Sequence, residues 1–162
     1  MNDDELERTA ALLKEVKRAG WVRAGHPAPE SVAAHSWAVS FLALLRCPPG
    51  LDRERLLVMA ILHDLAEVIV GDITPHDGVT PAEKHAREAA AMADLLSGRP
   101  DLLAAWEDAE ARRSPEAKLL KQLDLLDMKL QAEHYSRTGQ LSPEAAHEFI
   151  DSAARSLSPR HI

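Results

Sequence analysis

The amino-acid sequence predicts an all-α protein. Alanine and leucine together account for 50 of the 162 residues, whereas valine, isoleucine and threonine together account for 17. Small and unbranched side chains favour helices, and β-branched side chains favour strands. In addition, no stretch alternates polar and apolar residues as a half-buried strand does, and no hairpin turn joins two strand-like segments. The predicted architecture is therefore a set of helices connected by loops.

Glycine, proline and capping residues divide the chain into about six to seven expected helices. Ser31 and Asp52 can each cap a helix, because a side-chain oxygen can accept a hydrogen bond from a free N–H group of the first turn. Pro81 suits a first helical turn, and Gly20 and Gly71 mark helix ends. The expected helices span about residues 3–19, 31–46, 52–70, 81–96, 101–111, 114–135 and 143–156.

The length fits one globular domain. A domain of about 150 residues buries roughly 70% of the surface that its unfolded chain exposes, and the sequence contains no repeat or low-complexity linker. Residues 1–162 are therefore expected to form a single domain, with the informative motifs in residues 21–135. Residues 143–162 are expected to hold a C-terminal helix and a short frayed tail.

Charge and aromatic content argue against nucleic acid as a partner. The chain has 26 acidic and 19 basic residues, a formal net charge of −7, and 4% aromatic residues. A nucleic-acid surface needs a basic face and aromatic rings on which bases can stack. We therefore expect no nucleic-acid partner.

The sequence also argues against a membrane. Its longest apolar run, Leu56 to Leu62, is far shorter than the roughly 20 residues that span a bilayer. The first residues, MNDDELER, are acidic, whereas a secretory signal begins with basic residues. The single cysteine, Cys47, fits a reducing compartment. The prediction is a soluble cytoplasmic protein.

The expected helix over residues 52–70 carries three ionisable residues in an apolar segment. In LLVMAILHDLAEVIV these are His63, Asp64 and Glu67. Their spacing places them within a wedge of about 100° on a helix. A buried carboxylate is unfavourable unless it is paired or coordinated. The pattern therefore indicates a divalent cation site, or else a buried polar cluster satisfied by the backbone or by a basic residue of another helix.

Two further helices place polar residues on inward faces. His35 is in register with Val39 and Leu42, so it faces inward as a ligand or as a hydrogen-bonded core residue. In the helix over residues 114–135, Asp124 and Asp127 both adjoin the leucine stripe. Periodicity alone does not choose between these two aspartates.

Asp72 follows the expected helix end directly, where a cationic side chain would suit the helix dipole better. It is either a functional group or a turn residue before Ile73. The six other histidines have no supporting context and are expected on the surface; they are His26, His76, His85, His134, His147 and His161.

The order H…HD…D, formed by His35, His63-Asp64 and Asp124, resembles the HD-domain metal-dependent phosphohydrolases. The segments ESVAAHSW, LHDLAEVIVGDITP, PAEKHAREAAAM and SPEAKLLKQLDLLDMKLQAEHY are similar to successive blocks of one branch of that family. This branch holds the YfbR-like 5′-deoxynucleotidases and their relatives called HD domain-containing protein 2. The resemblance covers about residues 21–135 and implies a helical HD-domain bundle.

The resemblance also implies roles for individual residues. The metal ligands would be His35, His63, Asp64 and Asp124, which selects Asp124 over Asp127. Glu67 matches the acidic residue proposed to activate the attacking water, and Asp72 matches a substrate-site aspartate, so both would be catalytic. Trp21 and Arg23 fall in the substrate-binding loop before the first histidine. The chain departs from the family at Ala34, where an acidic residue is usual, and at Gly20, where the YfbR type has an arginine.

The implied activity is the hydrolysis of 5′-deoxynucleoside monophosphates by a homodimer. Two histidines and two carboxylates suit one divalent transition metal, namely Mn, Co, Fe, Zn or Ni. The departures at Gly20 and Ala34 leave two alternatives, a nucleotide-binding or regulatory module and a phosphohydrolase for a different specialised nucleotide. A third alternative is a helical interaction domain whose polar cluster is structural.

Overall fold

In the computed structural model, residues 1–158 are described, and they form nine α-helices, one 3-10 turn and no β-strand. The all-α prediction is confirmed, while the expected number of six to seven helices is too low. The elements are α1 (Asp3–Ala11), η1 (Leu12–Lys14), α2 (Ala19–Arg23), α3 (Val32–Arg46), α4 (Arg53–Leu62), α5 (Glu67–Val70), α6 (Pro81–Leu95), α7 (Pro100–Ala111), α8 (Pro115–Arg137) and α9 (Pro143–Ser156). Within residues 1–158, none of the helices combines the length and the apolar character that crossing a membrane requires.

Capping residues begin most of the long helices where the sequence predicts it. The Ser31 side chain accepts a hydrogen bond from the Ala34 N–H group, and the Asp52 side chain accepts one from the Arg55 N–H group. Ser114 does the same at the start of α8. Each of these bonds satisfies a donor that would otherwise lack a partner in the first helical turn.

The first expected helix is shorter than predicted. It ends at Ala11, and the following residues pair with the segment before α3. Val32 N–H donates to Val16 O at 2.8 Å, and Arg18 N–H donates to Glu30 O at 3.1 Å. This pairing stops the helix and lets the chain turn into α2, which occupies part of the expected loop.

The expected helix over residues 52–70 is interrupted between α4 and α5. His63 Nδ1 lies 2.7 Å from Ala60 O, the carbonyl group that the next N–H of a continuing helix would use. The backbone then follows tighter bonds, from Leu65 N–H to Leu62 O and from Glu67 N–H to Asp64 O. Consequently His63 and Asp64 meet at a break in the helix, and a helical wheel does not describe their arrangement.

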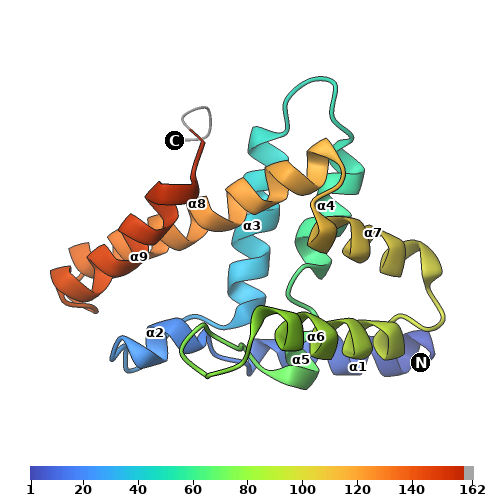
Figure 1. Cartoon of the computed structure of the whole chain (residues 1–162), viewed down its shortest axis with the longest axis horizontal. Coiled ribbons are helices and arrows are strands. Elements are labelled where there is room, and N and C mark those ends of the chain that lie inside the picture. Colours follow the sequence, from blue (N-terminus) through green and yellow to red (C-terminus); the bar gives the residue numbers. More distant parts are fainter. Residues whose placement is uncertain (159–162) are drawn as a thin grey trace.

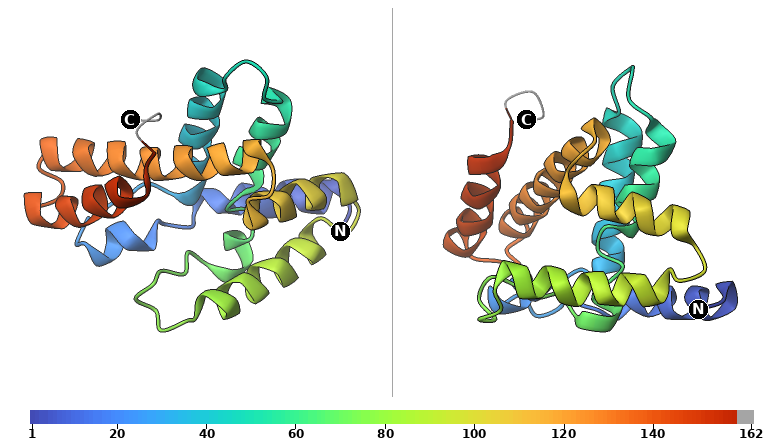
Figure 2. Two further views of the ribbon diagram at one scale, coloured as in Figure 1. Left: turned by 45° about the horizontal axis from the view of Figure 1, so that its top comes forward. Right: turned by 45° about the vertical axis from the view of Figure 1, so that its right-hand side comes forward.

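The main core lies between α3, α4 and α8, around Val39, Leu56, Met59 and Leu123. A second cluster joins α1 and α6, where Leu6 packs against the group that includes Met92 and Trp106. Figure 1 shows α1, α5 and α6 below the steeply inclined α3 and α4. In the views of Figure 2, α8 and α9 lie side by side. The polar residues of the site lie where these groups of helices meet.

Two surface predictions are corrected. His26 is 4% exposed and packs against Tyr135 with the rings tilted and 4.1 Å between their centroids, because the loop after α2 folds back over α8. The first residues of the expected frayed tail are ordered, since Leu157 is buried and Ser158 N–H donates to Gln122. His161 and the rest of residues 159–162 lie outside the described residues.

Candidate metal centre and substrate cavity

His35, His63, Asp64 and Asp124 come from three segments and converge inside the molecule. His35 lies in α3 and is fully buried. His63 and Asp64 occupy the break between α4 and α5, and Asp124 lies in the middle of α8. The side chains of Asp64 and Asp124 are 20% and 22% exposed, so the cluster reaches solvent on its carboxylate side.

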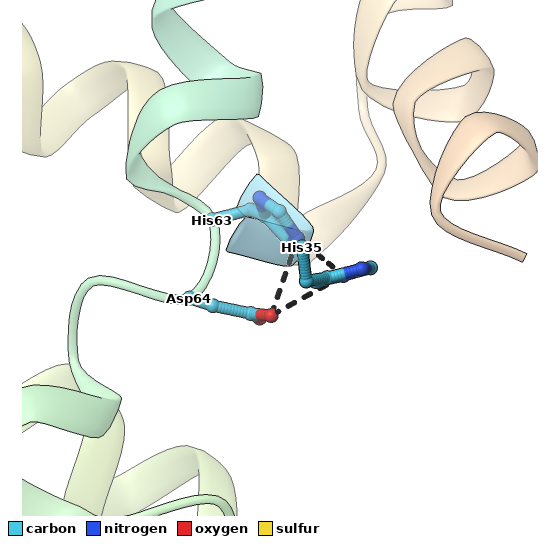
Figure 3. Close-up of side chains that lie close together, drawn as sticks. All are labelled: His35, His63 and Asp64. Atoms are coloured by element: carbon cyan, nitrogen blue, oxygen red, sulfur yellow. Dashed lines mark hydrogen bonds and ion pairs between the residues drawn. The ribbon is translucent and has the colours of Figure 1, made fainter. Parts of the chain in front are cut away.

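The four side chains bring their polar atoms together. His35 Nε2 lies 3.4 Å from His63 Nε2, 3.6 Å from Asp64 Oδ2 and 3.3 Å from Asp124 Oδ1. His63 Nε2 lies 3.3 Å from Asp64 Oδ2. In Figure 3 the two imidazole rings and the Asp64 carboxylate point toward one another. The two nitrogen atoms and Asp64 Oδ2 form a compact group of three, and Asp124 Oδ1 adjoins this group through His35.

The hydrogen bond at Nδ1 of each imidazole determines whether Nε2 has a free lone pair. His35 Nδ1 lies 2.7 Å from Asp127 Oδ2, and His63 Nδ1 lies 2.7 Å from Ala60 O. Both partners are hydrogen-bond acceptors, so each neutral ring carries its proton on Nδ1. The two Nε2 lone pairs then face each other across 3.4 Å beside two carboxylates. A cation bound between these electron-rich atoms would offset their mutual repulsion.

The donor set fits a divalent transition-metal ion. Two atoms that each bond one ion at about 2.1 Å are about 3.0 Å apart at octahedral angles and about 3.4 Å apart at tetrahedral angles. The three separations among His35, His63 and Asp64, and that between His35 and Asp124, are 3.3–3.6 Å. Imidazole nitrogens together with carboxylate oxygens suit such ions.

The two aspartates of α8 lie on opposite sides of His35. Asp124 is on the Nε2 side, with the other three polar groups, whereas the buried Asp127 is on the Nδ1 side. Glu30, His35 and Asp127 form a second group of acidic and imidazole atoms on that outer side. Periodicity could not separate Asp124 from Asp127, because the difference depends on which imidazole nitrogen each one reaches.

The carboxylates of the cluster are strongly held in the ionised form. Burial alone would raise the pKa of Asp64, but the charges of His63, His35 and Arg18 hold that pKa well below its usual range. For Asp124, Lys121 and His35 likewise overcome burial and lower the pKa. Lys121 Nζ donates to Asp124 Oδ2 at 2.7 Å.

The imidazole of His35 responds to the same charges. Burial and the charge of Arg18 would lower its pKa, but hydrogen bonds with Asp124 and Asp127 and the charge of Asp64 raise the pKa to about 9. The site thus attracts positive charge strongly. A proton on His35 and a metal ion would compete for the same Nε2 atom.

Glu67 lies at the start of α5 and is 2% exposed. Among the described residues, none donates a hydrogen bond to its Oε2 atom. Burial, together with the charges of Asp64 and Asp72, raises the pKa of Glu67 to about 10. A carboxyl group in this state can hold or accept a proton near neutral pH, depending on the charge placed beside it.

Arg18 is a site residue that sequence reasoning missed. It precedes α2, and its Nη1 lies 3.7 Å from Asp64 Oδ2. Burial would lower its pKa, but the charges of Asp64 and Asp72 raise it. Asp72 also binds this segment, because its Oδ2 accepts a hydrogen bond from Ala19 N–H at 2.7 Å. In the sequence Arg18 is one of several basic residues of the expected first helix, and nothing local distinguishes it.

A cavity of about 650 Å³ opens beside the cluster, a volume typical of small-molecule sites. Trp21 and Arg23 are among its lining residues. However, Trp21 is 1% exposed and donates its indole N–H to Glu30 at 3.0 Å. Arg23 pairs with Glu148 at 2.6 Å. The polar residues on the cavity wall include Arg18, His63, Asp64, Glu67, Asp72, Lys84, Lys121 and Asp124.

The helical fold and the histidine–aspartate cluster together define an HD domain. A family model described as HD domain matches residues 10–160. Solved structures agree with this fold. A conserved hypothetical protein from Pyrococcus furiosus superimposes with a TM-score of 0.78 at 33% identity, over 95% of this chain and 96% of that one. A protein from Pyrococcus horikoshii OT3 has a TM-score of 0.76 at 32% identity, over 95% and 90% of the two chains.

Curated relatives narrow the class further. The 5′-deoxynucleotidase HDDC2 of Danio rerio is 44% identical over 143 residues, which are 85% of this chain and 71% of the relative. The Homo sapiens protein of that name is 38% identical over 152 residues, 91% of this chain and 74% of the relative. The chain therefore belongs to the HD-domain family of the 5′-deoxynucleotidases HDDC2.

Proposed function

We propose that this chain is a metal-dependent phosphomonoesterase that hydrolyses 5′-deoxynucleoside monophosphates to a deoxynucleoside and phosphate. The observation that carries the proposal is the convergence of two imidazole Nε2 atoms and two carboxylates on the wall of a cavity of about 650 Å³. The names of the curated relatives, at 33–44% identity, support the substrate class.

His35, His63, Asp64 and Asp124 would hold one divalent transition-metal ion, with Mn, Co, Fe, Zn and Ni as the chemically suitable choices. When bound, such an ion offsets the charge of the phosphate and lowers the pKa of water at the site. The protein supplies a preorganised ligand set, because Asp127 and Ala60 O fix the two imidazole rings from behind.

Glu67 is the proposed general base. Its buried Oε2 has no hydrogen-bond donor among the described residues, and it lines the cavity three residues after Asp64. Positive charge beside Asp64 favours the ionised form of Glu67, which can then take a proton from the attacking water. Asp72, anchored to Ala19 N–H, is proposed to orient the sugar or the leaving oxygen.

Arg18 is the proposed phosphate-binding cation, with Arg23 farther out on the cavity wall. It compensates for Gly20, which stands at the arginine position of the YfbR type. We expect Arg18→Ala to lower kcat/KM for dAMP by about 10²-fold with metal content unchanged, because a guanidinium stabilises phosphate charge directly. Lys17→Ala, at an exposed neighbour, is the control. Equal kcat/KM values for Arg18→Ala and wild type would exclude this role.

Asp127 is the proposed positioning residue for His35. Replacing it with asparagine leaves the volume but removes the charged acceptor at Nδ1. We expect a metal dissociation constant about 10–100-fold higher, with activity recovering at high metal concentration, as for other residues behind a metal ligand. Competition with a fluorescent chelator measures the constant. An unchanged constant would leave Asp127 as a packing residue only.

Phosphate release by metal-stripped protein tests the function directly. The substrates are dAMP, AMP and 3′-dAMP, each with and without added Mn²⁺ or Co²⁺. The proposal predicts metal-dependent release from dAMP in preference to the other two. Release from none of them, with metal demonstrably bound, would contradict it and favour a nucleotide-binding or regulatory module or an enzyme for a different specialised nucleotide.

A homodimer is the proposed assembly, with the exposed face of α3 as the contact. Trp37 and Leu45 are 69% and 64% exposed, and Phe41 stacks on Trp37 with 5.7 Å between ring centroids. These residues, together with Leu44, form one apolar stripe, which suits a self-complementary contact between antiparallel copies of α3.

We expect light scattering to give twice the chain mass of 17.8 kDa for wild type and the single mass for Trp37→Glu. The introduced charge would have to be buried without a partner in the dimer. Leu12→Glu, at an exposed site on η1, is the control and should remain dimeric. A monomeric wild type, or a dimeric Trp37→Glu, would contradict this interface.

The proposed location is the cytoplasm. The single cysteine, Cys47, is buried with a free thiol, so the chain cannot form an internal disulfide. A free buried thiol suits a reducing compartment. Immunodetection of the protein in cell fractions checks this location, and recovery outside the cytoplasmic fraction would contradict it.

A further inference from the structure

The last helix contributes a wall of the cavity that the metal chemistry does not use. Phe149, Ser152 and Arg155 line the cavity from α9, next to Leu125 and Met128 of α8. Leu125 directly follows Asp124, so this wall begins beside the proposed metal ligand. A helix that only covered the bundle would not need residues in the cavity.

The two sides of the cavity differ in chemistry. On the side of α6 and α7 the lining is charged, with Lys84, His85, Glu88 and Glu110 among its residues. The α9 side offers three apolar side chains, those of Phe149, Leu125 and Met128, beside the polar Glu148, Ser152 and Arg155. A phosphate group suits the charged centre, whereas a base and the carbon face of a sugar suit the apolar side.

Phe149 packs closely against Gly20 and Trp21. Its ring centroid lies 4.2 Å from that of Trp21, and a Cβ atom on Gly20 would come within 3.2 Å of the Phe149 ring. Trp21 is itself fixed by its bond to Glu30 and by an edge contact with Tyr135. Gly20, where the YfbR type has an arginine, thus provides the space in which Phe149 packs.

Ion pairs join the same helix to the rim of the cavity. Glu148 lies 2.6 Å from Arg23 of α2 and 3.8 Å from His76 in the loop after α5. These groups are substantially exposed, so their contribution to stability is small. The ring contact with Gly20 and Trp21 therefore positions α9 more than the ion pairs do.

We propose that α9 is the nucleoside-binding wall of the site and that Phe149 is the residue against which the base packs. The inference rests on the proposed nucleotide hydrolysis, because it takes the phosphate to lie at the metal ligands and Arg18. From there the nucleoside extends along Leu125 and Met128 to Phe149. Phe149 is thus a specificity-determining residue outside the metal cluster.

The test compares two substrates that differ only in the base. For Phe149→Leu, kcat/KM for dAMP should fall about 10-fold, mainly through KM, because a base packed on an aromatic ring loses that contact. For 2-deoxyribose 5-phosphate, which has no base, kcat/KM should stay within about twofold of wild type. An equal loss for both substrates, or no loss for dAMP, would overturn the proposal.

The matched control is His147→Leu, a substitution at an exposed position of the same helix outside the cavity. It should leave kcat/KM unchanged for both substrates. Phe149→Met is a second variant that keeps a large apolar side chain against Trp21, and it should show the same pattern if Phe149→Leu does not fold. Circular dichroism verifies that each variant retains its helices.

Binding of deoxyadenosine separates this inference from the proposed function, because the nucleoside has no phosphate to release. By NMR titration, wild type and His147→Leu should bind it equally, and Phe149→Leu about 10-fold more weakly. If dAMP is not hydrolysed but this binding pattern holds, the proposed hydrolysis is wrong and the nucleoside-binding role of α9 is supported. If dAMP is hydrolysed but the variants bind deoxyadenosine alike, the proposed hydrolysis is supported and the nucleoside-binding role of α9 is wrong.

Discussion

Asp64→Ala is expected to remove the bound metal and to lower kcat/KM for dAMP by about 10³-fold or more. Asp64 Oδ2 lies 3.3 Å from His63 Nε2 and 3.6 Å from His35 Nε2, so the substitution deletes one of four converging donors. Elemental analysis of the purified protein and phosphate release from dAMP measure the two effects. Asp94→Ala, at an exposed site on α6, is the control and should retain metal and activity.

Thermal unfolding adds a reading that does not depend on turnover. An ion that binds only the folded protein raises the stability of the protein, so chelation should lower the Tm of wild type. The Tm of Asp64→Ala should not respond to chelator. A metal-replete, active Asp64→Ala protein would contradict the assignment of Asp64 as a ligand.

Glu67→Gln is expected to retain the metal but to lose turnover by about 10²–10⁴-fold, the range associated with a general base. Glutamine has nearly the same shape, but it cannot take a proton from water at this position. The effect should appear in kcat, with metal content unchanged. Unchanged kcat would remove Glu67 from the mechanism.

The pH dependence of stability gives a second test of the Glu67 environment. Burial raises the pKa of Glu67 to about 10 in the folded protein, above its ordinary value near 4.5. Between these two values folding takes up a proton, so this residue's contribution to the free energy of unfolding falls as pH rises. In metal-free protein, Glu67→Gln should therefore lose less stability than wild type from pH 5 to pH 9. Identical slopes would contradict a raised pKa.

Local signals in the sequence were sufficient to predict most of the helices and part of the site. Ser31, Asp52 and Ser114 act as caps because capping depends on neighbours within three residues. The inward position of His35 followed from its register with Val39, since the side of a helix that is buried repeats with its turns. The family resemblance, rather than periodicity, singled out Asp124.

Features that depend on distant contacts could not be predicted in this way. The helix break at His63 involves a side-chain bond to Ala60 O that competes with the helical pattern. Arg18 reaches Asp64 only because the chain before α2 pairs with the segment before α3. The close packing of Gly20 against Phe149, more than a hundred residues later, depends likewise on the tertiary fold.

The central claim is that one metal ion is held by His35, His63, Asp64 and Asp124. Anomalous diffraction from crystals grown with Mn²⁺ or Co²⁺ tests it most directly. The account predicts one strong peak within bonding distance of both Nε2 atoms, Asp64 Oδ2 and Asp124 Oδ1. A peak instead on the outer side of His35, between Glu30 and Asp127, or no peak at these residues in metal-saturated crystals, would contradict it.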